Sequence, residues 1–152
     1  MLTKILVIAV LVLATTMIHA AAMILCIRHV GIVKPKPWVQ KGGTTRALAI
    51  SSLVLIMLIA SVLEAGLWAM TYLTCGAIEE GLEKALYFSI VTYTTLGYGD
   101  IVVAQGWRVF ASIEAATGII MFGWTTALII AAVQHVYLQQ GQSSAQHVSD
   151  GG

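Results

Sequence analysis

The chain has 152 residues, of which 59% are hydrophobic and only 10% are charged, whereas about 25% of the residues in a typical globular domain are charged. This composition excludes an ordinary soluble domain, and the formal net charge of +1 is too small to indicate a nucleic-acid-binding protein. The sequence has no nucleophile–base pair, phosphate-binding loop or cluster with metal-ligand spacing, so we expect no enzymatic activity, no cofactor and no small-molecule substrate. The composition instead predicts a protein embedded in a lipid bilayer.

The first apolar run extends over residues 5–27 without a charge. A helix needs about 20 apolar residues to cross a membrane, so residues 1–27 are predicted to form an N-terminal transmembrane helix. A secretory signal peptide is the alternative, because three alanines at 20–22 are typical of a cleavage site. The run continues past these alanines and is longer than a signal core, which favours a retained helix. His19 in this run is expected to be a core residue with a polar partner.

A basic connector is predicted at residues 28–46, because proline and glycine are dense there. Only Lys4 precedes the first helix, whereas the connector holds Arg28, Lys34, Lys36, Lys41 and Arg46. Since short cytoplasmic loops are rich in Lys and Arg, we expect the N-terminus outside and the connector and C-terminus in the cytoplasm. The predicted location is the inner (plasma) membrane, crossed several times.

The second apolar run predicts an outer helix at residues 47–74, again long enough to cross a membrane. Cys75 follows it on the outer face, whereas Cys26 lies at the inner end of the first helix. Two cysteines on opposite faces of a membrane are too far apart to pair within one chain, so both are expected to be unpaired. A disulfide between subunits at Cys75 is the alternative.

A short apolar segment at residues 83–94 predicts a helix that is too short to cross a membrane. It leads into the sequence TTLGYGD at residues 94–100. Non-helical backbone at membrane depth is tolerated only where it is buried in protein or lines a watery cavity, so this loop is expected to assemble with others. Gly97 and Gly99 adopt positive φ without a Cβ penalty, which allows successive carbonyl groups to point to one side.

The TTLGYGD motif resembles the selectivity filter of the potassium channel superfamily. Residues 47–137 resemble its bacterial two-transmembrane pore domain (ion channel family 2), here with one additional N-terminal helix. The resemblance implies an all-α membrane protein with three transmembrane helices, a re-entrant pore helix and a filter loop at 95–99, assembled as a homotetramer. In that family, backbone carbonyl groups replace the hydration shell of the permeant K⁺ ion. The implied K⁺ ligands are the carbonyl oxygens of Thr95, Leu96, Gly97 and Tyr98 together with the Thr95 hydroxyl, and Gly99 completes the filter.

Three residues are expected to support the filter, namely Thr94, Tyr87 and Asp100. Some bacterial relatives place a glutamate in the pore helix that pairs with the filter aspartate, but the matching residue here is Val91. Asp100 therefore needs another partner, and the Tyr87 hydroxyl is the candidate.

The third apolar run predicts an inner helix at residues 107–137, and the polar residues 138–152 are predicted to form a disordered cytoplasmic tail. The resemblance makes Gly118 the hinge of the gate, with Gly123 as a second small residue nearby. Close helix packing is the alternative for Gly118, because small residues let helices approach. The resemblance also implies a set of cavity-lining residues, namely Ile119, Phe122, Thr126, Ala127 and Ile130.

Two carboxyl groups lie inside the predicted spans, those of Glu64 and Glu114. Ionisable groups within spans are costly and usually face protein or water. We expect both to form hydrogen bonds behind the pore helix. They either brace that helix, which is the favoured interpretation, or share a proton and make the filter sensitive to pH.

These features together predict a subunit that conducts K⁺ passively through a tetrameric filter. One alternative is a subunit of a potassium-uptake transporter, but such chains are longer and carry four pore loops, whereas this chain has one. The other alternative is a non-conducting or accessory membrane scaffold. The stimulus that opens the channel, its resting state and the role of the first helix are not indicated by the sequence.

Overall fold

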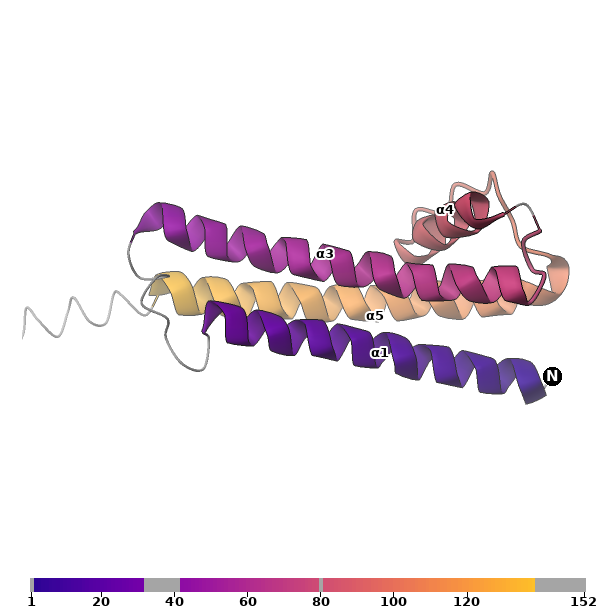
Figure 1. The fold of residues 1–152 in the computed structure, drawn as a ribbon, viewed down its shortest axis with the longest axis horizontal. Coiled ribbons are helices and arrows are strands. Elements are labelled where there is room, and N and C mark those ends of the chain that lie inside the picture. The colour runs from indigo at the N-terminus through magenta and orange to yellow at the C-terminus, as the bar shows by residue number, and fades with distance from the viewer. Residues whose placement is uncertain (1, 32–41, 80, 139–152) are drawn as a thin grey trace, which may run out of the picture.

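Three long helices lie side by side in the computed structural model, and a shorter helix packs against one end of them (Figure 1). The long helices are α1 (Leu2–Val30), α3 (Gly43–Thr74) and α5 (Arg108–Val133), and the short one is α4 (Leu82–Tyr93). The structure describes residues 2–31, 42–79 and 81–138. Every regular element in these residues is helical, which confirms the all-α class.

Each long helix is long and apolar enough to cross a membrane, with candidate spans at Leu2–Val30, Gly43–Thr74 and Gln105–Val136. The 29 residues of α1 extend about 44 Å, which exceeds the ~30 Å of a hydrocarbon core. Large apolar side chains are exposed along the helices, such as Leu13 and Ile120, as expected for a surface that faces lipid. The chain is a multi-pass membrane protein.

The predicted connector at residues 28–46 is too long. Helix α1 continues through Arg28 to Val30, and α3 already begins at Gly43. Cations are favourable in the last turn of a helix, and the aliphatic stem of arginine can lie along apolar surface, so the basic residues extend α1 instead of ending it. Three lysines of the predicted connector lie outside the described residues, namely Lys34, Lys36 and Lys41.

The ends of the other helices also differ from the predictions. Instead of one helix at 107–137, the structure has a 3₁₀ turn (Gln105–Trp107), then α5, then a π-helical turn (Gln134–Leu138). Helix α5 starts one residue later because the backbone of Trp107 is not helical, with φ −114° and ψ 0°. The pore helix, predicted at 83–94, is α4. Of the predicted tail, only Leu138 is described, and it belongs to the π-helical turn.

A glycine turn directs the chain from α3 toward α4. Gly76 has φ 65°, and the amides of Gly76 and Ala77 donate to the carbonyl oxygens of Leu73 (3.1 Å) and Tyr72 (2.9 Å). This is the Schellman pattern, which satisfies the last carbonyl groups of a helix and reverses the chain. As a result, α4 lies at the same end of the molecule as the N-terminus of α1 (Figure 1).

An aromatic cluster joins α3, α4 and α5 at this end. The ring of Phe110 meets Trp68, Tyr72 and Trp107 edge-on, with centroids 5.1, 5.4 and 5.3 Å apart. Phe88 on α4 meets Tyr72 in the same way at 5.2 Å. Edge-to-face aromatic pairs contribute about 0.5–1.5 kcal/mol beyond their burial, so this cluster stabilises the packing of α3 against α4 and α5.

Candidate functional site

The loop after α4 alternates the handedness of its backbone. Thr95, Gly97 and Gly99 have φ of 62°, 58° and 75°, whereas Leu96 and Tyr98 between them do not have positive φ. Alternation of this kind turns successive peptide units to the same side, while in a regular strand they alternate. The backbone of residues 95–99, called the filter segment below, is therefore shaped to present a row of carbonyl groups.

Positive φ at Thr95 was not predicted, because glycine alone adopts it without a Cβ penalty. It is the single non-glycine residue with positive φ among residues 2–31, 42–79 and 81–138. A β-branched residue in this region is strained by roughly 1–3 kcal/mol and persists only where its surroundings hold it. Thr95, Gly97 and Gly99 follow one another at intervals of two residues, and this regular spacing is the signal that could have indicated positive φ at Thr95.

Hydrogen bonds hold the filter segment to the end of α4. The amide of Thr95 donates to the carbonyl of Thr92 (2.9 Å), and the amide of Gly97 donates back to Val91 (3.2 Å). Thr94 caps α4, since its amide and its hydroxyl both donate to the carbonyl of Ile90, at 2.9 and 2.6 Å. The strained segment is thus tied to the helix that precedes it.

The far end of the filter segment is tied to α4 by a side chain. The hydroxyl of Tyr87 donates to Oδ2 of Asp100 at 2.7 Å. Tyr87 was the expected partner, because the side chain of Val91 cannot form a hydrogen bond with Asp100. This hydrogen bond holds the pKa of Asp100 below its ordinary value and raises the pKa of Tyr87.

Replacing Tyr87 by phenylalanine is expected to raise the pKa of Asp100 toward the ordinary value of about 3.9. Because the depressed pKa reflects a stabilised carboxylate, the bond stabilises the fold at neutral pH, and this contribution is lost as the pH falls through the pKa of Asp100. Carboxyl carbon NMR titration of the two proteins in micelles measures the shift. An unchanged pKa in Tyr87→Phe would show that the bond is not formed in solution.

The two carboxyl groups inside the spans both form hydrogen bonds with side chains of α4, as expected. Glu64 and Glu114 are fully buried. The hydroxyl of Tyr93 donates to Glu64, and the hydroxyl of Ser89 donates to Glu114. A second hydroxyl, that of Tyr72, also donates to Glu114. Each carboxyl group therefore braces a different turn of α4, and the shared proton stays a prediction.

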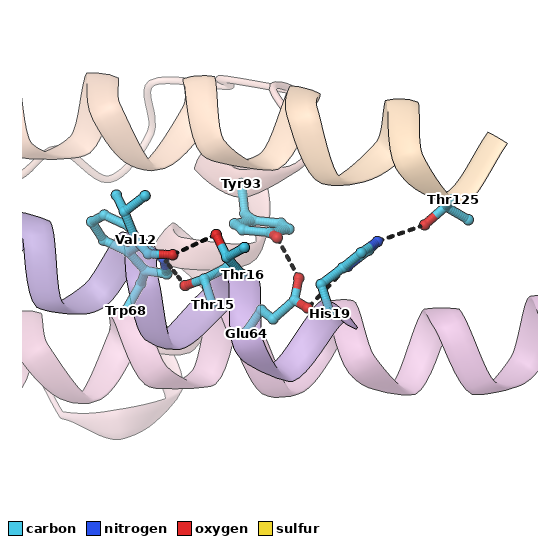
Figure 2. A network of polar contacts seen from close by, with 8 residues as sticks. All are labelled: Val12, Thr15, Thr16, His19, Glu64, Trp68, Tyr93 and Thr125. Carbon is cyan, nitrogen blue, oxygen red and sulfur yellow. Dashed lines mark hydrogen bonds and ion pairs between the residues drawn. The ribbon is translucent and has the colours of Figure 1, made fainter. Parts of the chain in front are cut away.

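His19 is the second partner of Glu64, and it comes from α1. Its Nδ1 lies 3.0 Å from Oε1 of Glu64, and its Nε2 lies 3.3 Å from the hydroxyl of Thr125 on α5 (Figure 2). The histidine is fully buried, so it is a core residue with polar partners, as expected. Its link to α4 through Glu64 was not predicted.

Gly118 lies directly against the end of α4. A Cβ added to it would be 2.0 Å from the carbonyl oxygen of Tyr93, whereas a Cβ added to Gly123 would meet nothing within 4 Å. This contact fits the close-packing alternative for Gly118. The hinge role of both glycines stays a prediction.

One face of α5 is left open by the protomer. Ile119, Gly123, Thr126 and Ile130 are exposed, and at about 100° per residue they share one stripe of the helix. Two other predicted cavity residues lie at its edges. Phe122 is half-buried, with its ring 5.9 Å from that of Tyr93, and Ala127 is exposed beside a hollow between α1 and α5.

A protein-family model described as "Ion channel" matches residues 48–135, which is more than half of the chain. The match covers nearly all of α3, the whole of α4 and the filter segment, and all of α5. Helix α1 lies outside it. No curated protein and no solved structure matches the chain.

Proposed function

Because the chain belongs to the ion channel family whose model matches residues 48–135, we propose that it is one subunit of a potassium-selective channel that conducts K⁺ passively. The chain is an ion channel protein and not an enzyme. The observation that carries the proposal is the positive φ at Thr95, Gly97 and Gly99, which shapes the TTLGYGD loop for inward-facing carbonyl groups. K⁺ is the permeant ion, and no cofactor is involved.

The filter binds K⁺ through oxygen atoms alone. The proposed ligands are the carbonyl oxygens of residues 95–98 and the Thr95 hydroxyl, which together replace the water around the ion. Neutral oxygens bind the ion firmly enough to dehydrate it and weakly enough to release it. Helix α4 ends just before the filter segment, and the partial negative charge at the C-terminus of a helix favours a cation there.

A ring of oxygen atoms requires several copies of the chain, and we propose four. Two features of the protomer support assembly at this place. Leu96 and Tyr98 are 57% and 67% exposed, and because they lie in a non-helical loop, which cannot face lipid at membrane depth, a partner is expected to cover them. An open hollow of 410 Å³ also lies between α4, the filter segment and the start of α5, where a neighbouring copy can pack.

The exposed stripe of α5 lines the proposed cavity below the filter, and the gate lies on the same helix. Gly123 lies in that stripe with free space around it, whereas the position of Gly118 is filled by the end of α4. Gly123 is therefore the better placed of the two for bending.

The proposed orientation places the N-terminus and the filter on the outside and the C-terminus in the cytoplasm of a cell whose inner membrane holds the channel. The ammonium group of Lys4 donates to the carbonyl of Gly106 (2.9 Å) and lies 4.1 Å from the ring centre of Trp107. The N-terminus of α1 and the exit of the pore loop therefore share one face, as this orientation requires.

Reconstitution in liposomes tests the proposal. Purified protein is expected to dissipate a K⁺ gradient and to leave an equal Na⁺ gradient nearly unchanged, measured with ion-selective dyes in protein-free and protein-containing vesicles. Equal passage of sodium would contradict selectivity. Accumulation of K⁺ against its gradient would indicate a transporter, and the absence of any flux would favour the scaffold.

A further inference from the structure

Helix α1 lies outside the matched residues 48–135, yet it contributes buried polar side chains to the pore domain. Thr15 and His19 have no exposed surface. Polar groups in the middle of a membrane span are costly and are retained where they have a partner and a role. These two side chains lie one turn apart on the same face of α1. Thr15 meets Trp68 of α3, and the ring of His19 lies between Glu64 of α3 and Thr125 of α5 (Figure 2).

A continuous chain of contacts runs from α1 to the end of α4. Nδ1 of His19 lies 3.0 Å from one oxygen of Glu64, and the hydroxyl of Tyr93 donates to the other oxygen (Figure 2). Tyr93 is the last residue of α4, and Thr95 follows two positions later. The carboxyl group of Glu64 is thus shared between the additional helix and the residue that leads into the filter segment.

The hydrogen-bonding chemistry of these groups limits which of them can donate and which can accept. The hydroxyl of Tyr93 donates to one oxygen of Glu64, and the tautomer of His19 that carries its proton on Nδ1 donates to the other, since carboxyl oxygens accept hydrogen bonds. Nε2 of His19 then faces the hydroxyl of Thr125, which can donate to a neutral ring or accept from a protonated one. Among the described residues, no buried side-chain nitrogen or oxygen lacks a hydrogen-bond partner.

We propose that His19 is a positioning residue of the filter, acting through Glu64 and Tyr93. The imidazole fixes the carboxyl group of Glu64, which holds the hydroxyl of Tyr93 and thereby sets where the filter segment begins. Helix α1 is then a built-in brace that determines how well the pore discriminates between ions. This inference rests on the proposed function, since it assigns a role in selectivity.

Thr15 provides a matched control on the same helix. Its hydroxyl accepts a hydrogen bond from Nε1 of Trp68 at 3.2 Å, a second buried contact between α1 and α3. Trp68 packs on Phe110, and neither residue belongs to the filter segment. Thr15→Val therefore removes a hydrogen bond between the same two helices and leaves the contacts among His19, Glu64 and Tyr93 in place.

Liposome flux of K⁺ and Na⁺ tests the role. His19→Leu and Tyr93→Phe are each expected to lower the K⁺/Na⁺ flux ratio about tenfold, which corresponds to ~1.4 kcal/mol. His19→Asn is expected to restore the ratio, because its amide nitrogen is bonded to Cγ, as Nδ1 is in histidine, and can donate to Glu64. Thr15→Val is expected to leave the ratio unchanged.

The double variant His19→Leu/Tyr93→Phe is expected to lower the K⁺/Na⁺ flux ratio no further than either single variant does, because both substitutions interrupt the same series of contacts. Additive losses would show that the two residues act separately and would overturn the proposal. An unchanged ratio in His19→Leu, or an equal loss in Thr15→Val, would overturn it as well.

Amide hydrogen exchange gives a second measurement that does not depend on flux. His19→Leu and Tyr93→Phe are expected to speed exchange at residues 91–99, whereas Thr15→Val is not. Unchanged exchange would overturn the positioning role even if the wild-type channel is selective. A wild-type protein without potassium selectivity would contradict the proposed function instead, and faster exchange in these two variants would still support the brace.

Discussion

Gly118→Ala is expected to destabilise the protein, whereas Gly123→Ala on the same helix is expected to stabilise it. At Gly118 the new Cβ would lie 2.0 Å from the carbonyl oxygen of Tyr93, and this atom belongs to a helix backbone that cannot rotate away. Overpacking of this kind costs about 1–3 kcal/mol. At Gly123 nothing lies within 4 Å, so alanine gains about 0.8–1 kcal/mol of helix propensity.

Thermal unfolding of the two variants in detergent measures the difference, with the wild-type protein as reference. A lower midpoint for Gly118→Ala and a higher one for Gly123→Ala are the expected results. If both variants were stabilised, the end of α4 would not rest on Gly118 in solution, and the hinge interpretation would gain support. A selective loss of K⁺ flux in Gly123→Ala, without a loss of stability, would support bending at that residue.

Gly99→Ala is expected to abolish potassium selectivity while leaving assembly intact. Gly99 has φ 75°, and an L-residue in this region costs about 1–2 kcal/mol. Space is not the obstacle, because an added Cβ would only approach the carbonyl oxygen of Gly97 at 4.0 Å. In the proposed tetramer the strain would occur four times around one ring of oxygens, so the backbone is expected to relax and misplace its carbonyl groups.

Gly76→Ala is the matched control for this substitution. Gly76 also has positive φ, at 65°, with no atom within 4 Å of an added Cβ, but it lies in the turn after α3. It is expected to lose a similar amount of stability and to keep the wild-type K⁺/Na⁺ flux ratio. Particle size in detergent checks assembly in both variants. Retained selectivity in Gly99→Ala would contradict the role given to the backbone.

The sequence was sufficient to predict the spans and the shape of the loop at its glycines. Long apolar runs identify membrane helices directly, because the bilayer imposes their length. Gly97 and Gly99 indicated positive φ for the same kind of reason, since the residue type itself relieves a steric limit. Thr95 was missed because its neighbours hold it at positive φ against the preference of its own β-branched side chain.

The partners of the buried polar groups could not be predicted in detail. That Glu64 and Glu114 lie behind α4 followed from their depth in the spans, but the contact from His19 to Glu64 joins residues 45 positions apart. The contact from His19 to Thr125 joins residues 106 positions apart. No helical period relates such distant positions, so these pairs depend on how the three long helices pack.

The helix ends were missed for a different reason. The predicted connector starts at Arg28 because the polar stretch that holds the prolines and glycines begins there, although a helix can carry cations in its last turn. The role of Gly118 was left open in the sequence because a hinge and a close contact both favour glycine. In the structure the carbonyl group of Tyr93 lies against Gly118, so Gly118 makes a close packing contact with the end of α4.

The hydrogen bonds that connect His19, Glu64 and Tyr93 all form within a single protomer. In the proposed tetramer, each subunit would therefore meet its neighbours with its quarter of the filter already shaped, and joining four such quarters would lose less conformational freedom than ordering four flexible loops. A defect in one subunit then stays in that subunit. Mixed tetramers that combine intact and His19→Leu chains should discriminate between ions in graded steps, according to how many intact quarters they contain.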